Sequence, residues 1–507
     1  MKNQLKAGVM LSYLSNGINI VIQVAYMPVM IRLLGQSEFG LYSLASGVVS
    51  YLSLFSLGFT GAYFRYFARE NQKSDREGLA ALNGMFLTLF LVLACAALIC
   101  GFTLSCFPRQ IFGAKLSGAE LQEVQLLMQI LVVNISLSLI SCIFDSIVSA
   151  YEQFIFQRGL ALLATVLNPF ICLPLLLMGY GNIMLVAVTT CITIGKLAVN
   201  ICFCVRKLKI PVSFRNLRFS TLNEVWIFSL FLLLNMMIDQ INWNVDKLIL
   251  SHMYGTGEVA VYGVASQINR LFLTFSTTIS SVFSPRINRI AADYAGNSSD
   301  EFTLLMVRVG RIQWMILGLM AMGLIVFGKY FIVNIYAGSG YEDAYTASLF
   351  LVLPALVPLI QNVGIEIQRA LNRHQFRSII YCAMAVLNIF ISIPLAKRFG
   401  AVGTAMGTAI SLILANGIIM NVFYHKALKI NMVFFWKEIR KTLPGFLIPS
   451  ILGALIVRYV SFDNLMKYAV WIVVFAVVYC LSIYCLSCNK RERALVLGMI
   501  RRNQNES

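Results

Sequence analysis

Seven charged side chains lie inside long apolar stretches of this chain. A charge at the centre of a bilayer costs at least roughly 2.5–3.5 kcal/mol unless it faces a partner or a water-filled cavity. Each residue is therefore a candidate for ligand binding or for ion movement. The seven are Asp145, Lys196, Asp239, Asp246, Lys247, Arg270 and Glu366.

Three polar residues of the seventh predicted span share one helical face. Asp239, Asn242 and Asp246 follow the spacing i, i+3, i+7, which places them on one side of a helix. A polar stripe on a spanning helix indicates that it faces water or protein rather than lipid. Alternatively, Asp246 pairs with Lys247 or Arg270 and only fixes helix packing.

The other two acids, Asp145 and Glu366, lie near the ends of two spans that the charge pattern places toward the cytoplasm. They could line a cavity or relay protons. They could equally form ion pairs with arginines of the adjacent loops. The sequence predicts all four acids as cavity or ion-coupling residues.

The membrane-embedded cations Lys196, Lys247 and Arg270 point to an anionic ligand. Fixed cations in a cavity suit a phosphate or pyrophosphate headgroup. Four more arginines at the inner ends of two spans could form a basic vestibule where a lipid phosphate first docks, or could only anchor the spans. These four are Arg65, Arg69, Arg286 and Arg289.

Composition indicates the elements that must position these charges. The chain has 507 residues, of which 59% are hydrophobic and 12% charged, about half the charged fraction of a soluble protein. Apolar runs long enough to span a bilayer recur throughout, so we predict an all-α integral membrane protein with about 14 transmembrane helices. The expected spans are 8–33, 40–64, 80–106, 121–149, 158–179, 182–205, 223–250, 259–285, 309–334, 344–370, 376–396, 401–424, 443–460 and 467–488.

Basic residues cluster on alternate loops and on both termini, which predicts that both termini are cytoplasmic. This bias, together with anionic lipid headgroups, explains most of the net charge of +18 and argues against nucleic acid as a partner. The 12 cysteines lie mostly in apolar runs and the 3 histidines show no ligand spacing. We therefore expect neither a metal site nor a cofactor.

A tandem repeat organises the chain. GQSEFGLYSLAS from Gly35 matches GTGEVAVYGVAS from Gly255, and VLNPFICLP from Val166 matches VLNIFISIP from Val386. Both pairs are displaced by the same 220 positions. The repeat predicts an N-terminal six-helix bundle at 1–210 and a second bundle at 221–430, with two extra helices and a tail at 431–507. An even number of spans gives both bundles the same direction, typical of transporters that alternate around a central cavity.

Two further roles follow from this arrangement. Pro28, Pro354 and Pro358 interrupt spans and could act as hinges. Glu38 and Glu258 occupy matching outer turns, where a carboxylate is favoured near a helix N-terminus. We therefore predict helix capping for these two acids rather than transport chemistry.

The hairpin sequences resemble a known family. DKLILSHMYGTGEVAVYGVAS, from Asp246 to Ser266, resembles the hairpin between spans 7 and 8 of polysaccharide-unit flippases, and LLGQSEFGLYSLAS, from Leu33, resembles their first hairpin. These are O-antigen-type flippases of the multidrug/oligosaccharidyl-lipid/polysaccharide exporter superfamily. Ser251-His252 departs from the glycine that the family often has there.

The resemblance implies that the chain moves a polyprenyl-pyrophosphate-linked oligosaccharide from the cytoplasmic to the outer leaflet of a bacterial inner membrane, by alternating access. It implies membrane lipids as partners and could add a polysaccharide polymerase or chain-length complex. No catalytic residues are expected.

Two other functions stay open. An ion-coupled multidrug or cation antiporter of the same superfamily would suit a cavity rich in carboxylates. A polymerase or glycosyltransferase is disfavoured because no connection is long enough to hold a catalytic domain.

Overall fold

The structure, a computed structural model, describes residues 2–56, 59–72, 76–214, 237, 240–241, 243–292, 299–371, 373 and 375–494. Every regular element within these ranges is helical. The predicted all-α fold is thus confirmed. Asp239 and Asn242 lie outside the described residues.

In the described part of the chain, nine helical stretches are long and apolar enough to cross a membrane, or ten if one bent pair counts as a span. The protein is therefore a multi-pass membrane protein, but the predicted count of fourteen is not confirmed. One stretch, Leu14–Asn71, has 58 residues and would be about 87 Å long as a straight helix. The hydrocarbon core is only about 30 Å thick, so this stretch must bend.

The bends fall at glycines with left-handed backbone. Gly35 has φ 73° within α2 (Met27–Val49), and Gly400 has φ 54° within α15 (Gln375–Leu412). A side chain at such a φ is strained. Both glycines lie where the sequence predicts turns between spans.

The chain forms two compact units, Met1–Val264 with Ile389–Thr404, and Ala265–Asn388 with Ala405–Ser507. We refer to them as unit 1 and unit 2. The domain boundaries expected from the repeat stay a prediction.

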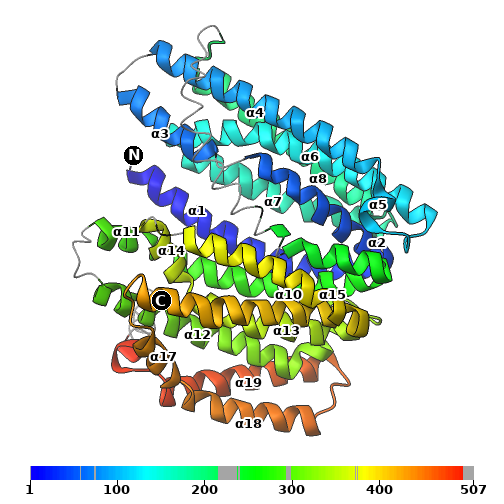
Figure 1. Cartoon of the computed structure of the whole chain (residues 1–507), viewed down its shortest axis with the longest axis vertical. Helices are drawn as coiled ribbons and strands as arrows, with labels where there is room; N and C mark the ends of the chain where they lie inside the picture. The colour runs from blue at the N-terminus through cyan, green and yellow to red at the C-terminus, as the bar shows by residue number, and fades with distance from the viewer. Residues whose placement is uncertain are drawn as a thin grey trace. The chain divides into compact units, whose positions relative to one another are not determined.

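Unit 1 contains the whole of the first repeat, the start of the second as far as the beginning of α10 (Thr256–Ser281), and Ile389–Thr404 of α15. Besides α2, its elements are α1 (Lys2–Val21), η1 (Ile22–Tyr26), η2 (Ser50–Ser56), α3 (Phe59–Gln72), α4 (Arg76–Ser105), α5 (Pro108–Phe112), α6 (Gly118–Ala150), α7 (Phe154–Leu177), α8 (Asn182–Cys202) and η3 (Phe203–Lys207). Helices α4, α6 and α8 pack side by side, and α1 packs against α7 (Figure 1).

An aromatic core joins α3, α4 and α6 in unit 1. Tyr63 packs edge-on against Phe86, and its hydroxyl donates to Asn83 Oδ1 over 2.8 Å. The Asn83 amide in turn donates to the Pro211 carbonyl at 2.9 Å. Buried polar groups need such partners, so this chain of bonds holds the segment after η3 against α4.

Unit 2 contains the rest of α10 and the C-terminal helices. Short helices α11 and α17 occupy segments that the sequence predicts as connections. The elements are α11 (Ser284–Ala292), α12 (Ser299–Tyr330), η4 (Phe331–Tyr336), α13 (Glu342–Ile360), α14 (Asn362–Ala370), most of α15, η5 (Ile413–Ile419), α16 (Met420–Lys426), α17 (Met432–Arg440), α18 (Pro444–Tyr459) and α19 (Leu465–Leu486).

The two copies of the sequence LKI fold alike. Lys209 and Lys429 both have left-handed backbone, with φ of 46° and 54°. Two phenylalanine rings stack near each turn, Phe156 on Phe203 and Phe376 on Phe423. The 220-residue displacement of the sequence is therefore also a displacement of local structure.

The outer-turn acids cap helices other than their own. The Glu38 carboxylate accepts a hydrogen bond from the backbone N–H of Asn182 at 3.1 Å, at the N-terminus of α8. The Glu258 carboxylate accepts from the Ala401 amide at 2.6 Å, directly after the bend at Gly400. Each acid satisfies an unpaired helix N–H and lies at the positive end of a helix dipole.

We expect Glu38→Gln and Glu258→Gln each to lower stability by about 0.5–2 kcal/mol, the usual value of a cap. The thermal midpoint of the purified protein in detergent measures this. Asp463→Asn, an exposed acid outside the helices, is the control, since a surface ion pair contributes little to stability. Midpoints that fall equally in all three variants would contradict the capping role.

A buried arginine fastens the C-terminal segment within unit 2. Arg311 of α12 is only 3% exposed. Its guanidinium donates to both carboxylate oxygens of Glu492, at 2.7 and 2.8 Å, and to the carbonyls of Glu438 and Ser487. This bidentate pair links α12 to α17 and to the chain beyond α19.

This bond predicts an acid-sensitive C-terminal segment. Burial by itself would raise the pKa of Glu492, but the hydrogen bonds from Arg311 and the Asn489 amide lower it overall. A lowered folded-state pKa means that the stabilisation is complete above the ordinary glutamate pKa, about 4.3, and disappears as pH falls through the folded value.

Glu492→Gln should lower the free energy of unfolding by about 3 kcal/mol or more at neutral pH, because it leaves Arg311 buried without its countercharge. The variant should also show a smaller loss of thermal midpoint on acidification than the wild type. An unchanged acid response in Glu492→Gln would refute the assignment.

Candidate functional site

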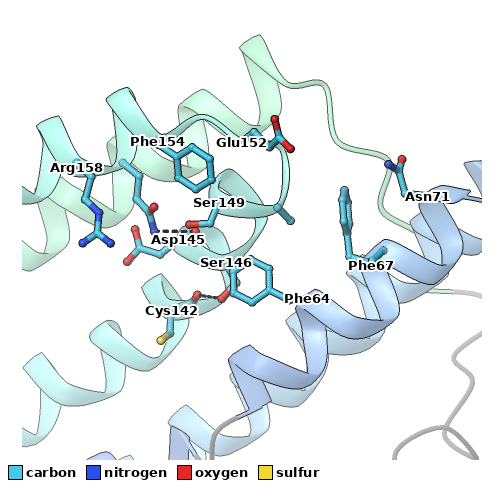
Figure 2. Close-up of a pocket in the computed structure, with 13 residues that line it drawn as sticks. Phe64, Phe67, Asn71, Cys142, Asp145, Ser146, Ser149, Glu152, Phe154 and Arg158 are labelled. Atoms are coloured by element: carbon cyan, nitrogen blue, oxygen red, sulfur yellow. Dashed lines mark hydrogen bonds between the residues drawn. The ribbon is translucent and has the colours of Figure 1, made fainter. Parts of the chain in front are cut away.

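A cavity of about 750 Å³ opens in unit 1 between α3, α6 and the start of α7. Figure 2 shows Phe64 and Phe67 from α3 on one side, facing Asp145 and Arg158 from α6 and α7. Aromatic walls with a few convergent polar groups are typical of ligand sites. The lining residues come from the end of the unit that the charge pattern predicts to be cytoplasmic.

One residue of the cavity lining, Asp145, belongs to an ion pair. Lys196 Nζ of α8 is 2.8 Å from Asp145 Oδ2, and the Asn200 amide donates to Asp145 Oδ1 at 2.9 Å. The two charged side chains are 27% and 23% exposed. Pairing and partial hydration together make these charges tolerable within helices of a membrane protein.

The ion pair belongs to one repeat only. At a displacement of 220, Asp145 corresponds to Ile365, Lys196 to Asn416 and Asn200 to Met420. This charged arrangement is therefore not required by the fold that the two repeats share.

Arg158 is the cation of the cavity that is exposed to solvent. Gln157 beside it donates to the Asp145 backbone carbonyl at 3.1 Å, which anchors the start of α7 to α6. A guanidinium beside aromatic faces can receive an anionic or sugar-bearing group. The arrangement suits the binding of such a group.

The two homologous hairpins meet within unit 1. A Cβ at Gly40 would collide with the Thr256 carbonyl oxygen, so the backbones there are in direct contact. Glu120 of α6 accepts from Ser37 at 3.0 Å and from Thr256 at 2.9 Å. These contacts close the end of unit 1 that is predicted to face outward.

A second polar network continues this closure. Ser50 donates to Gln240 Oε1 at 2.9 Å, and the Asn244 amide donates to the same oxygen at 2.7 Å. Predicted span 7 therefore contacts η2 through Gln240 and Asn244, which are not among the residues of the predicted polar face.

The structure distributes the other predicted acids differently. Asp246 is fully buried, and its Oδ2 accepts from the Tyr262 hydroxyl at 2.6 Å. Glu366 pairs with Arg369 at 2.9 Å, one turn away on α14. For Glu366 this is the loop-arginine pairing that the sequence left as an alternative.

The predicted cations do not gather in the cavity of unit 1. Of these, Lys196 alone reaches the ion pair, while Lys247 is half-buried on the helix before Gly255. The remaining five are exposed: Arg65, Arg69, Arg270, Arg286 and Arg289.

The predicted hinge residues occupy different contexts. Pro28 is buried at the start of α2, directly after η1. Pro354 and Pro358 lie inside α13, which ends two residues after Pro358. A hinge role for them stays a prediction.

Three residues of the site were missing from the sequence-based candidates: Asn200, Gln157 and Arg158. Asn200 could have been found, because it lies four residues after Lys196 and so on the same helical face. Gln157 and Arg158 carry no such signal, since only the packing of α7 onto α6 brings them to Asp145.

Comparison with known proteins identifies the family of this chain. A family described as polysaccharide biosynthesis protein matches residues 5–291, more than half of the sequence. The chain belongs to this family. A member of the curated proteins, "Putative O-antigen transporter" of Shigella flexneri, is 21% identical over 400 residues, covering 78% of this chain and 91% of that protein.

Solved structures agree with this family in fold. The lipid II flippase MurJ, in an inward closed conformation, superposes with a TM-score of 0.73 at 16% identity, covering 94% of this chain and 97% of that one. An inward-facing multidrug resistance MATE family transporter gives 0.59 at 14% identity, covering 82% and 98%. These likenesses show the fold. The names describe transporters and flippases, not enzymes.

The ion pair of this polysaccharide biosynthesis protein predicts energetic coupling between α6 and α8. Asp145→Asn and Lys196→Met should each lower the thermal midpoint. The free energy of unfolding lost by the double variant should be smaller than the sum of the two single losses, by about 0.5–3 kcal/mol. Asp300→Asn with Lys397→Met, two exposed residues, forms the control cycle. Strictly additive losses at Asp145 and Lys196 would contradict a direct interaction.

Proposed function

We propose that the protein is a flippase that carries a polyprenyl-pyrophosphate-linked oligosaccharide from the cytoplasmic to the outer leaflet of a bacterial inner membrane. The polar cavity of unit 1, within an apolar helical protein of this family, is the observation that carries the proposal. A hydrophilic glycan cannot cross hydrocarbon unless protein provides a polar path.

The chemistry of the cavity suits such a ligand. Arg158 would receive a phosphate, Phe64 and Phe67 would contact sugar faces, and the polyprenyl tail would stay in lipid. Lys196 would neutralise the charge of Asp145, which lines the cavity. Lys247, Arg270 and the four vestibule arginines would act later in the path or at its entrance.

The hairpin contacts support alternating access. Gly40, Thr256 and Glu120 close the predicted outer end of unit 1, whereas the cavity opens at the opposite, predicted cytoplasmic end. Transport would require these hairpins to separate. In this proposal both termini are cytoplasmic, and Asp239, Asp246 and Glu366 stay candidates for ion coupling.

A multidrug or cation antiporter, the alternative function, would use the carboxylates of the cavity. Asp145 is already paired with Lys196 at 2.8 Å, whereas Glu152, the other acid of the lining, is exposed. Export of a fluorescent cation from vesicles containing the protein would favour the antiporter and contradict our proposal.

Surface polysaccharide in a strain lacking the gene tests the proposal. Arg158→Ala and single Ala replacements of Lys196, Lys247 and Arg270 should each reduce surface polysaccharide several-fold while membrane insertion persists, because each removes a charge from the path. Arg206→Ala, an exposed arginine at the end of η3, is the matched control. Full complementation by all four variants would refute the cation-lined path.

A further inference from the structure

A second cavity, of about 840 Å³, lies within unit 2 and belongs to no part of the proposed transport path. It is bounded by α17, the end of α16 and Trp314 of α12. Four of its lining residues are basic or can become so: His425, Lys426, Lys437 and Arg440.

The charge of this cavity has one sign. No acidic side chain is among its lining residues in the described part of the chain. The nearest acid in sequence, Glu438, is turned away, since its carboxylate contacts Lys441 and lies 3.9 Å from Arg311. The cavity therefore has a mainly apolar surface with four basic residues in its lining and no internal counterion among the described lining residues.

The wall of the cavity is held in place before any ligand arrives. Trp436 Nε1 donates to Asn421 Oδ1 at 2.7 Å, and the Gln361 amide donates to the same oxygen at 3.1 Å. The side chain of Asn431 caps α17 by accepting from the backbone N–H of Phe434. The backbone N–H of Asn431 donates to the hydroxyl of Thr303 in α12. A preorganised wall lowers the cost of binding.

Helix α17 has the pattern of a helix that lies in a membrane interface. Met432, Phe435 and Ile439 are buried against the protein, whereas Val433 is 71% exposed and Leu443, just beyond the helix, 46%. Exposed apolar residues beside Lys and Arg are the mark of interfacial segments that contact both acyl chains and headgroups.

We propose that this cavity binds the headgroup of an anionic phospholipid of the cytoplasmic leaflet. Lys437 and Arg440 lie one turn apart on α17 and would bind the phosphate, with His425 and Lys426 opposite. Trp436 would lie at headgroup depth, and the acyl chains would run along Val433 and Leu443. Basic pockets beside membrane-spanning helices on this side are suited to such lipids.

The purified full-length chain, titrated with phosphatidylglycerol or with neutral phosphatidylethanolamine and analysed by native mass spectrometry, tests the site. Wild-type protein should retain phosphatidylglycerol in preference to phosphatidylethanolamine. Lys437→Gln with Arg440→Gln should weaken phosphatidylglycerol binding about tenfold or more, and Lys437→Arg should retain it. Arg206→Gln with Lys207→Gln removes the same charge from unit 1 and should change binding less than twofold.

Three outcomes would overturn the site: equal loss in the two charge-removal pairs, no loss in either, or full competition by inorganic phosphate alone. A second copy of the chain occupying the cavity, seen as a dimer lost in Lys437→Gln with Arg440→Gln, would also overturn it. A normal elution volume and helical circular dichroism of the variants exclude misfolding as the cause. Surface polysaccharide that is lost for transport reasons leaves lipid binding intact, so the two proposals fail separately.

Discussion

The absence of water within the bilayer is the constraint on which this structure depends. A charge or an open backbone group there must have a partner, face a cavity, or be absent. Asp145 finds Lys196 and Asn200, Arg311 finds Glu492, and the N-termini after Gly181 and Gly400 find Glu38 and Glu258. Helix packing in unit 1 and unit 2 is organised around these satisfied polar groups as much as around the aromatic core.

Duplication explains one class of these groups. The glutamate caps, the left-handed lysines of the two LKI turns and the stacked phenylalanines occur in both copies. They serve the fold, because either copy needs them to terminate and join its helices. The Asp145–Lys196 pair and the Arg311–Glu492 pair have no duplicate. The first borders a cavity suited to a ligand, and the second secures helices that the duplication does not supply.

The two cavities illustrate different uses of positive charge by a membrane protein. In unit 1 the charge of Lys196 is compensated by Asp145, whereas Arg158 is open to a ligand that must later leave. In unit 2 the basic residues border a pocket beside an interfacial helix, where a bound lipid would not need to dissociate. A flippase for an anionic lipid must distinguish these roles, since a site that holds a headgroup too firmly would stop transport.

The membrane class, the helical fold, the repeat and the turns near residues 34–39 and 397–400 could be predicted from the sequence, because hydropathy and periodicity are local signals. The sequence also singled out Asp145 and Lys196, since charge in an apolar run is visible without a structure. Tertiary packing brings these two residues together, places Glu38 at the N-terminus of α8, and buries Arg311 beside Glu492. Such partners are separated by tens to hundreds of residues, and nothing in local sequence specifies which helix faces will meet.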